Sequence, residues 1–147
     1  WEDFYREGGI VIADRYTTSN MVHQASKMDD INERANFLDW LDQYEYGLYK
    51  LPRPREVYFL DVPVDVSQDL IRDRKNKFTN ESEKDIHESD KGYLVKTYEN
   101  SKFVADKYQW HIVNCLDQDR NMRSVDQIHE EIYSRVISAI ESKKKGL

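Results

Sequence analysis

A short segment near the start of the chain places charged and hydrogen-bonding side chains where they could bind a ligand. The apolar residues 10–13 are typical of a buried strand, and this run ends in Asp14 and Arg15. Ligands bind at the carboxyl ends of strands in open α/β sheets, and an arginine fork suits phosphate because it donates two parallel hydrogen bonds. Four polar residues then follow at spacings that put them on one helix face: Ser19, Asn20, His23 and Gln24.

Each of these features also has an ordinary structural interpretation. Arg15 could simply form an ion pair with Asp14 at the end of a strand. The polar row could be the solvated side of a surface helix. The residue pattern alone leaves both alternatives open, although an amide such as Asn20 or Gln24 can read a base edge through its paired donor and acceptor.

The rest of the chain alternates short apolar runs with long helical patterns. Strands are expected at residues 10–13, 57–62 and 111–115, and this alternation predicts an α/β fold with a parallel sheet and crossover helices. The expected helices cover residues 1–7, 18–27, 30–46, 66–74, 90–108 and a last segment after Ser124, where Gln127 would complete a capping box.

Residues 75–89 differ from their surroundings, because they contain few apolar side chains and many charges of both signs. Such a segment is either a solvated loop or a mobile lid. We favour a lid, since cations that meet phosphates and a low intrinsic order are what a closing segment needs.

Composition limits the class of protein. The length of 147 residues fits one domain, residues 1–147. A formal net charge of −6 argues against non-specific nucleic-acid binding, and no apolar run approaches the roughly 20 residues of a membrane span. The single cysteine, Cys115, excludes an internal disulfide, fits a reducing cytoplasm and follows an apolar run, which favours a packed thiol.

Five segments, in order along most of the chain, resemble the thymidylate kinase family. The first is the Asp-Arg-Tyr sequence that begins at Asp14, with its following Ser-Asn helix. The second joins residues 51–54, Leu-Pro-Arg-Pro, to residues 57–63, which end in Leu-Asp-Val-Pro. The others are residues 71–74 and 84–88, which resemble the two ends of that family's lid, and residues 113–115 with the helix after them.

This resemblance implies a P-loop NTPase-type three-layer fold, with a parallel sheet flanked by helices. It also implies transfer of a phosphoryl group from ATP to dTMP with Mg²⁺, in a cytoplasmic homodimer. However, no G-x-x-x-x-G-K-[ST] motif occurs among the 147 residues. We therefore expect an N-terminally truncated piece of a longer kinase, inactive by itself.

The resemblance also assigns roles to the polar residues of the first segment. Arg15 would hold the acceptor phosphate and act in catalysis, and Asp14 would bind near Mg²⁺ or only orient Arg15. The row of Ser19, Asn20, His23 and Gln24 would line the nucleoside pocket. The family commonly has an aromatic residue at the position of His23, where it selects deoxyribose.

Further along the chain, the resemblance places Arg72 and Arg74 on the ATP side, as catalytic cations. Their alternative is a helix end whose cations interact with the dipole. Asp85 and Glu88 would face the acceptor's sugar and metal, or they form a first-turn charge pair. Asn114 would lie near the adenine.

Two other functions remain open at this point. A deoxynucleoside kinase has a related fold and also has an acidic residue and an arginine at the end of a strand. A non-catalytic nucleotide-binding protein would have no phosphate-binding loop at all. The Asn20 helix and the Leu-Asp-Val-Pro segment favour the monophosphate kinase.

Overall fold

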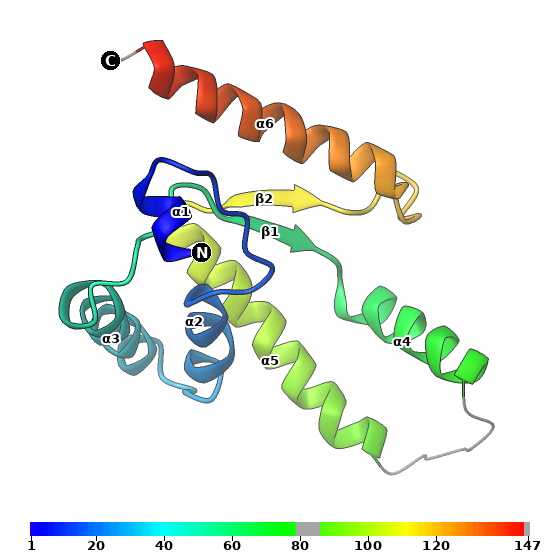
Figure 1. Cartoon of the computed structure of the whole chain (residues 1–147). Coiled ribbons are helices and arrows are strands. Elements are labelled where there is room, and N and C mark those ends of the chain that lie inside the picture. The colour runs from blue at the N-terminus through cyan, green and yellow to red at the C-terminus, as the bar shows by residue number, and fades with distance from the viewer. Residues whose placement is uncertain (79–85, 146–147) are drawn as a thin grey trace. The chain divides into compact units, whose positions relative to one another are not determined.

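The computed structural model shows a mostly helical α/β chain with a small parallel sheet (Figure 1). It describes the backbone of residues 1–78 and 86–145, and the side chains of residues 1–71 and 91–142. The chain forms two compact units, Trp1–Leu51 and Pro52–Leu147. Each unit is described by itself below.

Unit 1 is helical. It contains α1 (Glu2–Arg6), α2 (Thr18–Ala25), α3 (Ile31–Asp42) and the π-helix η1 (Gln43–Leu48). Helix α3 begins where expected, because the Asp30 side chain accepts hydrogen bonds from the backbone N–H groups of Asn32 and Glu33, at 2.9 and 2.8 Å. Its buried side, with Leu38 fully buried, faces the core of this unit.

The prediction of a buried strand at residues 10–13 is wrong. These residues have no regular secondary structure, and the Ile12 side chain is 84% exposed. A strand needs a hydrogen-bonded neighbour, and the sheet in the described part of the chain consists of two other strands. Residues 10–13 have the composition of a buried strand, but they have no neighbouring strand to pair with among the described residues.

The helix expected over residues 30–46 also changes character before its end. The α-helical hydrogen bonding gives way to a π-helix at Gln43, and this helix continues to Leu48. Aromatic rings accompany the change: Trp40 stacks on Tyr44 with ring centroids 5.1 Å apart, and Tyr44 meets Tyr49 edge-on at 4.8 Å. Segments of π-helix are rare in proteins, and those that occur are often found at functional sites.

Unit 2 contains the sheet. Its elements are β1 (Tyr58–Asp61), α4 (Val64–Phe78), α5 (Ile86–Lys107), β2 (His111–Asn114) and α6 (Val125–Lys145). The two strands pair in parallel, with Tyr58 opposite His111 and Asp61 opposite Asn114. This confirms the expected parallel pairing of the second and third apolar runs, with helices in the crossover.

The two long helices of unit 2 lie on opposite sides of this sheet, α5 on one side and α6 on the other (Figure 1). The core includes Val104 and Ala105 of α5 together with Val113 of β2, all at most 1% exposed. Cys115 is equally buried, and burial raises the pKa of its thiol. The expected packed thiol is therefore confirmed, and a thiol in this environment reacts slowly.

The predicted lid, residues 75–89, is described only at its two ends. Residues 75–78 end α4 and residues 86–89 begin α5, so both helices are longer than the sequence indicates. Residues 79–85 lie outside the described residues. None of the described helices has the length and apolar composition needed to cross a membrane.

Candidate functional site

The polar side chains at the start of α2 lie next to a backbone turn of unusual geometry. Arg15 has φ of 68°, in the left-handed region that non-glycine residues rarely adopt. Its exposed guanidinium donates a hydrogen bond from Nε to the Ser19 hydroxyl at 3.4 Å. Strained backbone of this kind is enriched at binding sites. The structure thus brings Arg15 and Ser19 together.

Asn20 is held by a hydrogen bond to a buried carboxylate. Its Nδ2 donates to Oε1 of Glu45 at 2.9 Å, and Glu45 is only 6% exposed. A second contact between the same two helices joins the hydroxyls of Thr17 and Tyr46, 2.5 Å apart. Burial, and then the Glu45 carboxylate, raise the pKa of the nearby Tyr16. These contacts fix α2 against η1, so that Asn20 is held in place.

The last two predicted residues on this helix differ from each other. Gln24 is exposed, and its Oε1 accepts a hydrogen bond from Lys27 at 2.7 Å. His23 is half-buried, and burial lowers its pKa below the usual 6.5, with further lowering by Arg15 and Lys27. We call Arg15, Ser19, Asn20, His23 and Gln24 the α2 polar face.

The lowered pKa of His23 predicts a loss of stability in mild acid. The unfolded chain takes up a proton at about pH 6.5 more readily than the folded chain, so the free energy of unfolding falls as pH drops from this value through the lower folded pKa. Urea unfolding at about pH 7.5 and about pH 5.5 measures this loss. His23→Gln should lose less stability than the unaltered protein over the same interval.

His129→Gln is the matched control, because this histidine is exposed on α6. It should lose the same stability as the unaltered protein. If His23→Gln loses as much stability in acid as the His129→Gln control, the folded state does not disfavour protonated His23.

Asp14 is exposed immediately before Arg15. In the described part of the chain, no group of three or more His, Cys, Asp or Glu side chains is placed to hold a metal ion.

Four other predicted residues fall where the structure describes no side chains. Arg72 and Arg74 lie on α4, and Glu88 lies near the start of α5. Asp85 lies outside the described residues. Their predicted roles stay predictions.

The carboxyl ends of the two strands bring Asp61 and Asn114 side by side. The Asp61 carboxylate accepts a hydrogen bond from the Tyr98 hydroxyl at 2.7 Å and lies 3.6 Å from the Lys102 ammonium. Burial, and then this hydrogen bond, raise the pKa of Tyr98. The Asp61 carboxylate therefore binds two side chains of α5, as expected of a structural carboxylate at the end of a strand.

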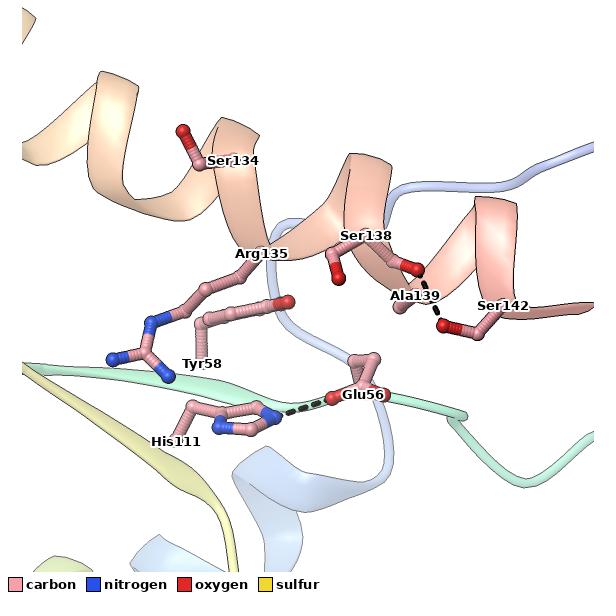
Figure 2. A pocket seen from close by; sticks show the side chains of 8 residues that line it. All are labelled: Glu56, Tyr58, His111, Ser134, Arg135, Ser138, Ala139 and Ser142. Atoms are coloured by element: carbon pink, nitrogen blue, oxygen red, sulfur yellow. Dashed lines mark hydrogen bonds and ion pairs between the residues drawn. The ribbon is translucent and has the colours of Figure 1, made fainter.

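A hollow of about 430 Å³, which the sequence did not indicate, lies in unit 2 between the sheet and α6 (Figure 2). His111 pairs with Glu56 and stacks on Tyr58, with ring centroids 5.1 Å apart. The Tyr58 hydroxyl is buried and has no hydrogen-bond partner among the described residues. Residues of α6, including Arg135 and Ser138, form the other wall. None of the residues predicted for the functional site line this hollow.

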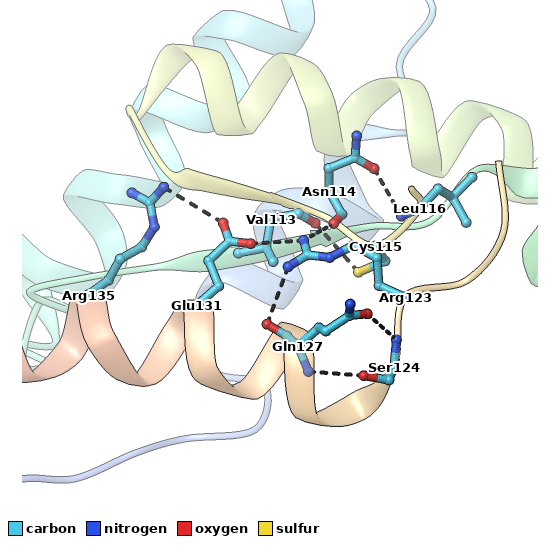
Figure 3. A network of polar contacts seen from close by, with 9 residues as sticks. All are labelled: Val113, Asn114, Cys115, Leu116, Arg123, Ser124, Gln127, Glu131 and Arg135. Atoms are coloured by element: carbon cyan, nitrogen blue, oxygen red, sulfur yellow. Dashed lines mark hydrogen bonds and ion pairs between the residues drawn. The ribbon is translucent and has the colours of Figure 1, made fainter. Parts of the chain in front are cut away.

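Asn114 belongs to a network that closes the turn after β2 (Figure 3). Its Oδ1 accepts the Leu116 N–H at 3.0 Å, and its backbone oxygen accepts from Arg123 at 2.6 Å. Arg123 also binds Glu131 at 2.8 Å. The side-chain oxygen of Asn114 is thus used within the turn, and its predicted contact with adenine is untested.

The same network begins α6. The Gln127 N–H donates to the Ser124 hydroxyl at 3.2 Å, while the Gln127 side-chain oxygen accepts the Ser124 N–H at 2.9 Å (Figure 3). This reciprocal pair is the capping box that the sequence predicts.

Glu45 is the residue of the α2 site that sequence reasoning missed. A signal existed, because Glu45 follows Leu41 by four residues and Leu38 by seven and so continues the buried stripe of α3. A carboxylate on an apolar stripe is buried on folding, so it must find a hydrogen-bond donor inside the protein.

Comparisons with protein-family models, with curated proteins and with solved structures found no match for this chain.

Proposed function

We propose that the chain is the acceptor-binding part of a thymidylate kinase, which transfers the γ-phosphoryl group of ATP to dTMP with Mg²⁺ and acts as a homodimer. The observation that carries this proposal is the α2 polar face. There an exposed arginine on a left-handed backbone lies beside Ser19, and the next residue, Asn20, is anchored to a buried carboxylate. This arrangement provides a cation for a phosphate and a fixed amide for a base.

The proposed division of labour follows from the chemistry of these groups. Arg15 would form charge-assisted hydrogen bonds to the acceptor phosphate, which aligns the attacking oxygen and offsets its charge. Asn20 would bind the base edge, and His23 and Gln24 would line the pocket beyond it. Mg²⁺ would supply charge neutralisation at the transferring phosphate, and Asp14 would hold it.

The donor side of the reaction needs groups that these 147 residues do not provide. Backbone N–H groups and the lysine of a phosphate-binding loop hold the β- and γ-phosphates in this class of enzyme, and the sequence has no such motif. We therefore assign the activity to the complete gene product.

A coupled ADP-release assay with dTMP, dUMP and thymidine tests this proposal. The complete gene product should form ADP with dTMP and Mg²⁺, whereas residues 1–147 alone should form none. Preference for thymidine over dTMP would instead indicate a deoxynucleoside kinase. Absence of ADP formation by the complete gene product with every acceptor would contradict a kinase function and favour a non-catalytic nucleotide-binding protein.

A further inference from the structure

We propose that Glu45 is a positioning residue that fixes the orientation of the Asn20 amide, and that this makes the site prefer a base with an N3–H donor, such as thymine, over cytosine. The inference rests on the function proposed above. Glu45 would act only through Asn20, without touching the nucleotide.

The first step is the burial of Glu45. This side chain is 6% exposed and lies in η1. One of its oxygens, Oε1, accepts the hydrogen bond from Asn20, while Oε2 is buried without a hydrogen-bond partner among the described residues. A buried carboxylate is costly unless it is hydrogen-bonded. The hydrogen bond with Asn20, at 2.9 Å, is therefore costly to lose.

The second step is the direction of that bond. An ionised carboxylate accepts hydrogen bonds and donates none. In the structure, Asn20 turns its NH₂ group, and not its oxygen, toward Glu45, because its Nδ2 donates to Oε1. The Asn20 oxygen then faces away from Glu45, and the residue as a whole is exposed, so this acceptor can meet a ligand. A glutamine at position 45 would remove the constraint, because its amide can present either a donor or an acceptor.

The third step is the base edge. Thymine carries an N–H donor at N3, whereas cytosine carries a lone pair there. A fixed acceptor on Asn20 pairs with the first and opposes the second, and an unpaired polar group at such an edge produces discrimination. If the Asn20 amide could turn over, it would present its NH₂ group to cytosine.

The experiment compares Glu45→Gln with Glu33→Gln in the complete gene product. Glu33 is an exposed residue in the first turn of α3, so its variant makes the same chemical change away from Asn20. The measurement is kcat/KM for dTMP divided by kcat/KM for dCMP. Because both values come from one preparation, the ratio does not depend on the fraction of folded enzyme. We expect Glu45→Gln to lower it roughly tenfold and Glu33→Gln to leave it unchanged.

A second measurement needs no nucleotide. In protein labelled with ¹⁵N-asparagine, the side-chain NH₂ resonances of Asn20 are assigned by their loss in Asn20→Asp. These resonances should move in Glu45→Gln and stay in place in Glu33→Gln, because only the first replaces the carboxylate acceptor.

An unchanged dTMP-to-dCMP ratio in Glu45→Gln would overturn the inference, whatever happens to the overall rate. A purely structural role for Glu45 would lower both values of kcat/KM equally and give that result. If the unaltered protein phosphorylates neither nucleotide, the proposed function fails, and a shifted Asn20 resonance would then show that the contact exists without that role.

Discussion

Replacement of Arg15 by alanine is expected to lower kcat/KM for dTMP about ten- to a hundredfold in the complete gene product. A charge-assisted contact to a phosphate contributes about 1.5–3 kcal/mol, and each 1.4 kcal/mol or so corresponds to about tenfold. The effect should fall on the acceptor, with KM for ATP little changed, because Arg15 lies on the face proposed to bind the monophosphate. Steady-state kinetics with each substrate varied in turn measure both quantities.

Arg6→Ala is the control for this substitution. Arg6 is also exposed in unit 1, where it pairs with Glu2 of the same helix, and it should leave both kinetic constants unchanged. If Arg15→Ala keeps the full kcat/KM for dTMP, Arg15 only supports the turn through its hydrogen bond to Ser19.

The second large effect is expected on stability. Leu38 is fully buried on α3, and its truncation to alanine should lower the free energy of unfolding by about 2–5 kcal/mol. The loss arises because the removed methyl groups leave a cavity that the packed neighbours fill only in part. Urea unfolding followed by circular dichroism of the helices measures this difference.

Leu48→Ala provides the comparison within the same unit, since Leu48 is 70% exposed in η1. Its effect should stay within about 0.5 kcal/mol. Equal losses from the two substitutions would mean that the α3 face does not form the core of unit 1 in solution.

The sequence predicted the elements whose signals are local. Two apolar runs became β1 and β2, shortened by one or two residues, because each finds the other as a parallel partner. The reciprocal hydrogen bonds between Ser124 and Gln127 form the expected capping box at the start of α6. The apolar spacing around Leu38 predicted a helix with a buried side, and α3 has one.

The sequence predicted less where a distant partner decides the outcome. Residues 10–13 have the composition of a buried strand, yet a strand depends on a neighbour that a local pattern does not reveal. The π-helix at Gln43–Leu48 was also missed, since helical periodicity does not separate it from an α-helix over so few residues. The position of Glu45 on the apolar stripe of α3 was a local signal, but its hydrogen bond to Asn20 joins residues 25 positions apart and leaves no local pattern.

The central claim is that dTMP binds at the α2 polar face, and a titration followed by ¹⁵N–¹H spectra of the complete gene product tests it most directly. The account predicts that added dTMP shifts the backbone resonances of Arg15, Ser19 and Asn20 most, together with Glu45 behind them. Shifts confined to Glu56, Tyr58 and His111 would place the nucleotide in the hollow beside α6 and contradict the account. So would spectra that do not change with dTMP.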